Sequence, residues 1–423
     1  MNGYATFEKL IFVISGRGVN HYDIKALRQS GSKVVVAIVN DNYRHTITDK
    51  TLNDFDEVCF VSTSSRNYGL DEVDEEETRK LIHEKMSHYR SEHQYIVCAN
   101  EGNMVVSASL RSHFNIPGLK HEDVFLFRNK CMMKTKLADN GVNTAKFIDF
   151  DINLAREHGS YYENIVQELG SPFVLKPKSS GGGKDVYIVK SSRQFSQITN
   201  DICSAKYEFF AESIIMGGLY HCDIMIHNRE VVFSECSKYN WDEFDEGSKH
   251  QIISSLPLEN SVMIKNKIVE FCEKIISILG ALDGTYHIEV FEENGELVFL
   301  ELGLRMPGTL IPKMYELMYD CNLWNIDLSI QCDFFAGNRY KQQRYALWAY
   351  FLEYEVGTIV KVEPLNENVD GFIDWYYGVG DAVSDTPALT GSVVYSSNSY
   401  EEIVSVFDCF RSKSPLVLEK EVN

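Results

Sequence analysis

The sequence contains no CxxC pair and no spacing of cysteine and histidine residues that suits a zinc site, although it has ten cysteines in 423 residues. Scattered cysteines without such a framework are typical of reduced, mostly buried thiols. The pattern therefore argues against a zinc module and predicts a cytoplasmic protein.

Long hydrophobic runs and an excess of basic residues are also missing. The N-terminal segment MNGYATFEKLIFVISG lacks a basic region, and its apolar run is too short to cross a membrane. With 61 acidic and 41 basic residues, the chain carries a net charge of −20, which argues against a nucleic acid or an anionic membrane as the main partner. We therefore expect no membrane segment and no nucleic-acid partner.

The chain is too long for one hydrophobic core, so we expect two to four lobes. The first lobe opens with a β-rich run at residues 10–15, a helix over 22–30 and a second run at 33–39. A third run follows at residues 95–99, and Ile116-Pro117-Gly118 closes the lobe near residue 120. This βαβ order predicts a parallel, doubly wound sheet.

Two nucleotide-binding motifs are incomplete. GRGVNH, after the first run, is not the full GxGxxG fingerprint, so Gly16 and Gly18 are interpreted as shaping a turn. The stretch SSGGGKDV lacks GxxxxGK[ST] and leads to a strand rather than a helix, which excludes a P-loop.

The second stretch still has features of a phosphate site. FVLKPKSSGGGKDVYIV, residues 173–189, predicts a strand, a glycine-rich loop and a second strand. Glycines let backbone N–H groups crowd around phosphate oxygens, and Lys176 and Lys184 supply positive charge. Taken alone, a flexible hairpin tip with solvated lysines explains the stretch equally well.

The remaining pattern predicts further α and β elements. We expect a helix that stops at Asn140-Gly141, a strand at residues 209–215, a long amphipathic helix at 261–279 and a hairpin at 287–304. From about Tyr340 the chain is rich in Val, Tyr, Gly and Thr, which predicts a small β-rich lobe.

The predicted hairpin carries charged residues among apolar ones. Strict alternation would place the apolar residues Val298, Leu300, Leu302 and Leu304 on one face of the strand. The opposite face would carry Phe299, Glu301, Gly303 and Arg305. A two-residue Asn294-Gly295 turn would pair Glu289 with Leu300, whereas an odd-length loop or an equivalent bulge brings Glu289 and Glu301 onto one face.

Paired carboxylates suit Mg²⁺, which keeps waters and completes its shell with substrate phosphates. The alternative is that Glu289 and Glu301 form the wet side of a half-exposed sheet. Arg305, which suits a planar anion, and the small Gly303, which leaves room for a ligand, favour the functional interpretation. His287 on the same face is either a packed, hydrogen-bonded histidine or a ligand.

In combination these residues resemble the ATP-grasp superfamily, through most of the chain. RNKCMMKTKLADNGVNTAKF is similar to the family's DK…L…GVxTxxF segment, SSGGGKDV to its lid loop and FFAESIIMGGLYHCD to its hinge. The spacing E-x-x-x-R followed by G-x-x-I-P is closest to the carboxylate–amine ligases of the L-amino-acid ligase group.

The resemblance implies an ATP-grasp fold, of α/β class, with a βαβ domain at residues 1–120, an ATP-grasp domain at 121–338 and a C-terminal β-rich lobe at 339–423. The lid subdomain would span about 143–211. It also implies roles for matching residues: Lys130, Lys176, Ser180, Gly181, Gly182 and Gly183 at the ATP phosphates; Glu212, Ser213, Ile214 and Ile215 beside the adenine; Glu289 and Glu301 on Mg²⁺, or Mn²⁺ instead; Arg305 at the substrate carboxylate.

Three positions depart from the family pattern. Asn129 stands where Asp is usual, Leu219 stands where many members carry a glutamate for the ribose hydroxyls, and Gly303 replaces the asparagine of the E-x-N metal motif. The metal site would therefore rest on Glu289 and Glu301 alone.

The function implied is an ATP-dependent ligase that joins a small carboxylate to an amine, with amino acids as substrates and an acyl phosphate as intermediate. The same resemblance is compatible with a protein that forms a homodimer. Two alternatives stay open. One is a biotin-carboxylase-like subunit, although the chain has no obvious biotinyl segment, and the other is a catalytically silent regulator that binds Mg·ATP.

Overall fold

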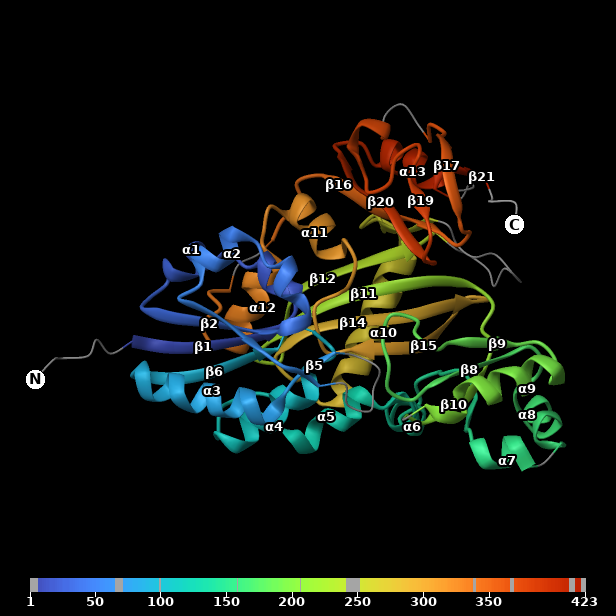
Figure 1. Cartoon of the computed structure of the whole chain (residues 1–423), viewed down its shortest axis with the longest axis horizontal. Coiled ribbons are helices and arrows are strands. Elements are labelled where there is room, and N and C mark those ends of the chain that lie inside the picture. The colour runs from blue at the N-terminus through green and yellow to red at the C-terminus, as the bar shows by residue number, and fades with distance from the viewer. Residues whose placement is uncertain are drawn as a thin grey trace, which may run out of the picture.

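The computed structural model describes residues 7–64, 71–98, 100–157, 159–205, 207–240, 252–337, 340–365, 369–410 and 415–419. Within these residues, helices pack against five sheets, which confirms the predicted mixed α/β class (Figure 1). None of the helices in the described ranges is both long and apolar enough to span a membrane.

The N-terminal sheet is parallel and doubly wound, as the βαβ order predicts. Its strands, in spatial order, are β3 (Glu57–Val61), β2 (Lys33–Asn40), β1 (Phe7–Ser15) and β6 (Ser91–Cys98). Leu10 and Phe12 pack toward α3 (Glu75–His88) and α4 (Met104–His113), whereas Ile11 packs on the other face. That other face is covered by α1 (Ile24–Arg28) and α12 (Leu323–Gln331). A helix from late in the chain thus completes the first layer.

Short elements connect these strands. They are η1 (Arg17–His21), η2 (Asp41–Thr46), α2 (Asp49–Asp54), β4 (Thr63–Ser64) and β5 (Glu72–Val73). Helices α5 (His121–Arg128) and α6 (Lys130–Asp139) then lead out of the first layer, and α6 ends before Asn140-Gly141 as predicted.

The central sheet is antiparallel and joins distant parts of the chain. In order its strands are β15 (Glu296–Gly303), β14 (Gly284–Glu293), β11 (Gly218–His227), β12 (Glu230–Tyr239), β13 (Ile252–Pro257), β16 (Tyr345–Glu353), β20 (Ala388–Ser397) and β18 (Ile373–Trp375). The amphipathic helix α10 (Met263–Leu279) covers one face, as the predicted helix should, and α11 (Ile311–Tyr319) packs on the opposite face. The sheet therefore has a hydrophobic cluster on each side.

Strands β11, β12 and β13 were not predicted from the sequence. The β11–β12 hairpin turns at Asn228 and Arg229, which both adopt positive φ, at 52° and 65°. Such a turn usually carries glycine at its second position. With arginine there, the hairpin signal is weak.

A small four-stranded sheet carries the glycine-rich loop. Its strands are β7 (Phe147–Asp149), β10 (Phe209–Ser213), β8 (Phe173–Pro177) and β9 (Tyr187–Val189), packed with α7 (Ile152–Glu157), α8 (Tyr161–Leu169), α9 (Ser192–Asp201) and η3 (Ile202–Ser204). The predicted order of strand, loop and strand over residues 173–189 is confirmed.

The C-terminal segment is β-rich, as predicted. It contains β17 (Gly357–Val362), β19 (Ala382–Val383), β21 (Leu416–Glu419), η4 (Asp370–Phe372) and α13 (Tyr400–Cys409) in addition to β16, β18 and β20. Because the last three strands extend the central sheet, this segment shares its backbone hydrogen bonds with the preceding one. The boundaries at residues 120 and 338 remain a prediction.

The β14–β15 hairpin has the register that a shared carboxylate face requires. Its turn is the two-residue Asn294-Gly295, and a bulge at Leu300 shifts the pairing so that Glu289 lies opposite Glu301. The prediction that Glu289 and Glu301 share one face is confirmed. A bulge, and not a loop of odd length, brings them together. Strict alternation was wrong at Phe299, which packs with Leu302 beneath α10 instead of facing Glu301's side.

We predict that Gly217→Ala destabilises the protein by about 3 kcal/mol, because an added Cβ would lie 2.1 Å from the carbonyl oxygen of Glu292 at a φ of +156°. Gly295→Ala is the matched control, since φ is +88° there and nothing lies within 4 Å. It should cost about 1 kcal/mol. Urea unfolding measures both, and equal losses would contradict the proposed backbone contact.

Candidate active site

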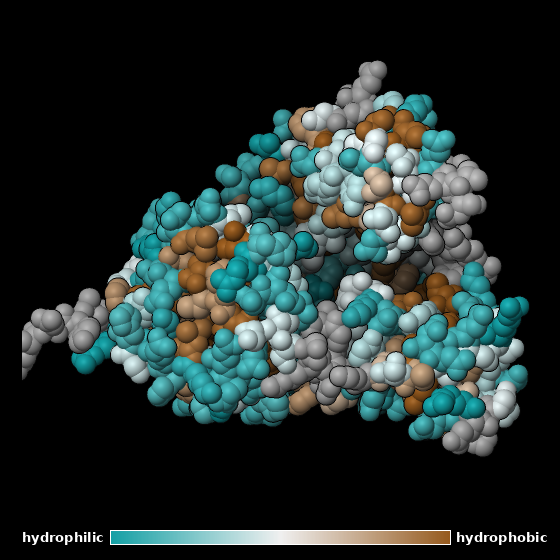
Figure 2. Space-filling view, in the orientation of Figure 1, coloured by the Kyte–Doolittle hydropathy of each residue, from teal (hydrophilic) through white to brown (hydrophobic). Residues whose placement is uncertain are grey.

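A cavity of about 420 Å³ lies where the N-terminal sheet, the glycine-rich loop and the β14–β15 hairpin meet. The space-filling view shows this face of the molecule hollowed near its centre (Figure 2). The cavity begins at Ser15, the last residue of β1, and includes Asn100 just after β6. Ligands of open α/β sheets bind at this carboxyl edge. The residues that line the cavity are Ser15, Gly16, Arg17, Gly18, His21, Tyr43, Asp71, Asn100, Glu101, Gly102, Gly181, Gly182, Arg305, Met306, Pro307, Gly308, Thr309 and Trp324.

Lys130 joins the glycine-rich loop to the hairpin. It is the first residue of α6, and its Nζ donates to the carbonyl oxygen of Ser180 at 2.6 Å and lies 3.5 Å from Glu301 Oε2. Asn129 caps the helix, accepting from the backbone N–H groups of Cys131 and Met132 at 3.0 and 3.1 Å. Asparagine caps a helix as well as aspartate does, so Asn129 can supply the cap at this position.

The glycine-rich loop requires its glycines in this conformation. A Cβ on Gly181 would lie 2.7 Å from Glu101 Oε2, and Gly182 and Gly183 have φ of +65° and +70°. The loop therefore approaches the N-terminal layer closely, with its backbone beside Lys130.

Lys176 and Glu212 form a buried ionic group. They lie on adjacent strands β8 and β10, and Glu212 contacts Lys176 through Oε1 and lies 3.0 Å from Lys134 Nζ through Oε2. Burial raises the pKa of Glu212, but the two lysine charges lower it overall. Burial likewise lowers the pKa of Lys176, and Glu212 raises it above its usual value. Both groups are held in their charged forms.

The two glutamates predicted to bind metal face each other across the hairpin. Glu289 Oε1 accepts from the Tyr239 hydroxyl at 3.1 Å and lies 3.5 Å from His287 Nε2. Burial raises the pKa of Glu289, and the hydrogen bond and charge of His287 lower it below its usual value. The Glu301 side chain is 33% exposed. These carboxylate oxygens are the donor type that Mg²⁺ and Mn²⁺ accept.

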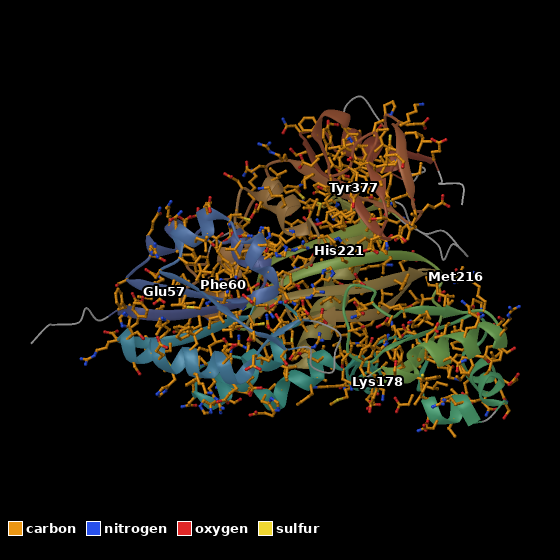
Figure 3. All side chains as sticks on the ribbon, in the orientation of Figure 1. Glu57, Phe60, Lys178, Met216, His221 and Tyr377 are labelled. Carbon is orange, nitrogen blue, oxygen red and sulfur yellow. The ribbon has the colours of Figure 1, made fainter. Side chains whose placement is uncertain are left out.

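Behind Glu289 lies a buried network that sequence reasoning missed. Asp223 accepts from Tyr315 OH at 2.7 Å and contacts Nδ1 of His221 at 2.8 Å and Nδ1 of His287 at 2.7 Å. His221 lies near the middle of the central sheet (Figure 3). Burial lowers the pKa of His287, but Asp223 raises it to about 9. The ligand atoms of His221, Asp223 and His287 lie within 4.8 Å of one another, and the hydrogen bonds between them already use the space an ion would need.

Arg305 does not contact Glu301; its closest carboxylate is Glu101. Nε donates to Glu101 Oε2 at 3.0 Å and Nη1 donates to the carbonyl oxygen of Met306 at 2.9 Å, while Arg128 contacts Glu101 Oε1. Burial raises the pKa of Glu101, but Arg305 and Arg128 lower it to about 2. A Cβ on Gly303 would lie 3.3 Å from Arg305 Cγ and Nε. The space an asparagine would need at position 303 is thus occupied by Arg305.

Residues 135–309 match the model of the ATP-grasp domain. The chain contains an ATP-grasp domain. An L-arginine-specific L-amino acid ligase of Bacillus subtilis is 26% identical over 246 residues, which are 56% of this chain and 57% of that protein. A D-alanine–D-alanine ligase of Oceanobacillus iheyensis is 20% identical over 337 residues, covering 73% of this chain and 90% of the relative.

The likeness in fold to a solved structure extends beyond the matched residues to nearly the whole chain. The crystal structure of an L-amino acid ligase from Bacillus licheniformis superposes with a TM-score of 0.71 at 16% identity, covering 98% of this chain and 99% of that one. The alignment with the arginine-specific ligase, in contrast, spans little more than half the length of that relative.

The segment that was predicted to be the hinge connects β10 to β11. Glu212 and Ser213 end β10, and Ile214 and Ile215 form the link to β11. Leu219, at the position of the family's ribose glutamate, is 6% exposed and packs in the apolar cluster with Phe291, its partner on β14. This position contributes to the core of the ATP-grasp domain.

Glu101 is the most important residue that sequence reasoning passed over. It stands just after β6, in CANEGN, at the carboxyl edge of the parallel sheet. The rule that ligands bind at that edge was the available signal. Its two arginine partners come from residues 27 and 204 positions away, which no local pattern could show.

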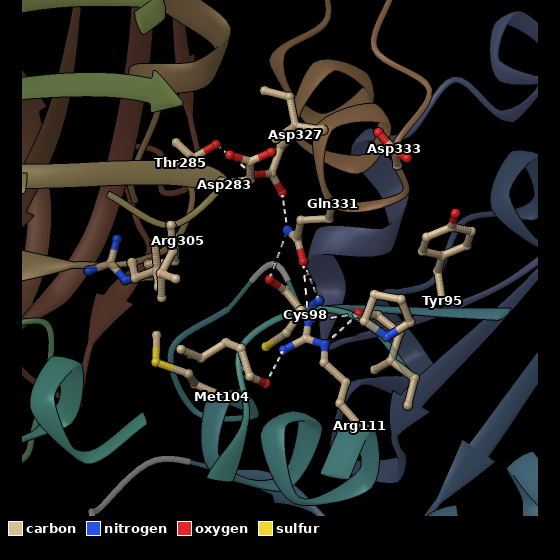
Figure 4. A pocket seen from close by; sticks show the side chains of 18 of the residues that line it. Tyr95, Cys98, Met104, Arg111, Asp283, Thr285, Arg305, Asp327, Gln331 and Asp333 are labelled. Carbon is tan, nitrogen blue, oxygen red and sulfur yellow. Dashed lines mark hydrogen bonds between the residues drawn. The ribbon is translucent and has the colours of Figure 1, made fainter. Parts of the chain in front are cut away.

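A second cavity, of about 530 Å³, lies on the other side of Arg305. In Figure 4, Gln331 bridges its walls: it donates to Asp327 Oδ2 at 2.7 Å and accepts from Arg111 Nη2 at 3.2 Å. Thr285 donates to Asp327 Oδ1 at 2.6 Å, and burial raises the pKa of Asp327 to about 6. These bonds connect α4 of the N-terminal layer, through α12, to β14.

We predict that the stabilising effect of Glu101 disappears in acid. The pKa of Glu101 is lowered to about 2 in the folded protein. Its contribution to the free energy of unfolding is therefore complete above the unfolded pKa and is lost as the pH falls from there through the folded pKa. The difference in unfolding free energy between the wild type and Glu101→Gln should shrink by about 2 kcal/mol between pH 6 and pH 3. Urea unfolding across this range measures it.

The control is Glu168→Gln, since Glu168 pairs with Lys146 at the surface, where both side chains are more than half exposed. Its difference from the wild type should change by less than about 0.5 kcal/mol over the same range. A Glu101→Gln difference that does not depend on pH would contradict a carboxylate held in its charged form by Arg128 and Arg305.

Proposed function

We propose that the protein is an ATP-dependent carboxylate–amine ligase that forms an amide bond between amino acids, or between an amino acid and another small acid. The observation that carries this proposal is the pair Glu101 and Arg305, which borders a cavity and lines a small crevice together with Lys130 and Glu301. The two relatives named above are ligases of amino acids by their names, which supports the same class.

ATP would lie between the small sheet and the central sheet. Lys130 and Lys176 would neutralise phosphate charge, and the backbone N–H groups of residues 180–183 would surround phosphate oxygens. The link at residues 212–215 would border the adenine. Glu212, which binds Lys134 and Lys176 together, positions both lysines at the same strand edge.

A divalent ion would be held by Glu289 and Glu301. Two facing carboxylates with a neighbouring phosphate-binding lysine fit the hard-cation chemistry of Mg²⁺. When bound, the ion would neutralise charge on the phosphates. Lys130, 3.5 Å from Glu301, would add positive charge at the same place.

The cavity suits a zwitterionic substrate. Arginine has five N–H donors, and the carbonyl of Met306 and the carboxylate of Glu101 take only two from Arg305. The remaining donors can orient a substrate carboxylate, while Glu101 can face the ammonium group. Tyr43 and Trp324 supply aromatic walls around the side chain. An amino acid matches this arrangement better than bicarbonate does, which disfavours the biotin-carboxylase alternative.

In the proposed reaction the substrate carboxylate oxygen attacks the γ-phosphorus of ATP, releasing ADP and forming an acyl phosphate. The neutral amine then attacks the carbonyl carbon, the amide bond forms as the bond from carbon to the phosphate oxygen breaks, inorganic phosphate leaves, and the proton lost by the amine passes to solvent. Arg305 stabilises the negative charge on the carboxylate oxygens in both steps. The glycine-rich loop, which already lies against Glu101, excludes water from the acyl phosphate.

We predict ADP release that requires ATP, a divalent ion, a carboxylate substrate and an amine. Glu301→Gln should lower turnover at least about 100-fold, as loss of a transition-state electrostatic contact does, with the circular dichroism unchanged. Glu296→Gln, an exposed glutamate of the same strand, should stay within about twofold. A coupled ADP assay with pairs of amino acids measures these rates.

Near-normal turnover of Glu301→Gln would contradict the metal assignment. ADP release with bicarbonate and biotin but with no amine would favour the biotin-carboxylase alternative. Binding of Mg·ATP without turnover for any pair would favour the silent regulator.

A further inference from the structure

We propose that His287 is the third protein ligand of the metal site, binding through Nε2 beside Glu289 and Glu301, and that the site prefers a transition ion such as Mn²⁺ to Mg²⁺. The inference rests on the proposed function, because it presupposes an ion between the two glutamates. It goes beyond that function by assigning a nitrogen donor and an ion class.

The strand register places the three side chains together. His287 lies opposite Gly303 and Glu289 lies opposite Glu301, so both pairs project from the same face of the hairpin. His287 and Glu301 also line one small crevice with Lys130. The imidazole therefore borders the place where the carboxylates converge.

Asp223 sets the tautomer of His287. Nδ1 contacts Asp223 Oδ1 at 2.7 Å, which directs Nε2 toward Glu289, where it lies 3.5 Å from Oε1. A carboxylate on one ring nitrogen and a metal on the other is the usual arrangement of metal-binding histidines. Two atoms each about 2.1 Å from one ion can be this far apart. A bound ion would replace the proton on Nε2.

Asp223 is itself held firmly. Its other oxygen accepts from Tyr315 OH and contacts His221, whose Nε2 contacts Ser255 Oγ at 2.9 Å. Asp223 is 1% exposed and His221 is fully buried. A histidine that only fills space in the core does not need such a long series of hydrogen bonds. A metal ligand needs it, because its ring must keep one orientation.

Gly303 gives the reason for a nitrogen donor at position 287. Position 303 has no side chain to offer, and Arg305 fills the space beside it. The cross-strand neighbour of that position is His287. One imidazole and two carboxylates suit Mn²⁺, Fe²⁺ or Co²⁺ better than Mg²⁺, which prefers oxygen ligands.

Electron spin-echo envelope modulation of Mn²⁺ bound to the full-length protein with ADP tests the proposal. We expect a coupling to a directly coordinated imidazole nitrogen in the wild type and in His83→Gln, an exposed histidine on α3, and no such coupling in His287→Gln. Titration followed by the signal of free Mn²⁺ should show at least tenfold weaker binding for His287→Gln. When Mg²⁺ is used to displace Mn²⁺, the affinity for Mg²⁺ should differ by less than threefold between the wild type and His287→Gln.

The wild-type spectrum decides the question even if His287→Gln folds poorly. Mn²⁺ that binds the wild type in a Glu301-dependent way without nitrogen coupling would overturn this proposal and leave the proposed function standing. Nitrogen coupling that persists in His287→Gln would also overturn it. Mn²⁺ binding unaffected by Glu301→Gln would overturn the metal site as a whole.

Discussion

The partly buried carboxylate of Glu101, whose side chain is 16% exposed, joins the segments that form the candidate site. Arg128, at the end of α5, and Arg305, two residues after β15, both contact it, and Gly181 of the glycine-rich loop lies against it. Three segments that are distant in the sequence thus meet at one charge. Replacing a buried ion pair with apolar residues often leaves stability unchanged or increases it. We therefore propose that the pair of Glu101 and Arg305 serves to bind the substrate rather than to stabilise the fold.

A second constraint is the bulge at Leu300. Without it, the Asn294-Gly295 turn would place Leu300 opposite Glu289 and send Glu301 to the other face. With it, the two glutamates and His287 share one face, and Phe299 turns into the core beneath α10. One additional residue in β15 therefore places the charged side chains on one face of the hairpin and Phe299 on the other.

Much of this arrangement could be predicted because its signals are local. Apolar runs with short spacings gave β1, β2 and β8, the 3.6-residue period gave α10, and the distance from Glu289 to Glu301 demanded a bulge or an odd loop. What escaped prediction depends on distant pairing. Glu101 meets Arg305 across 204 residues, Asp223 meets His287 across 64, and the turn of the β11–β12 hairpin lacks the usual glycine. Glu212 was predicted to lie beside the adenine, and no local pattern indicated that its side chain binds two buried lysines.

The central claim is that a carboxylate is activated by phosphorylation next to Arg305. An amino-acid substrate with both carboxylate oxygens labelled with ¹⁸O tests it most directly, with the inorganic phosphate analysed by mass spectrometry after amide formation. Our account predicts that one ¹⁸O atom is transferred to the phosphate for each amide formed. Phosphate without ¹⁸O, released at the rate of amide formation, would contradict it.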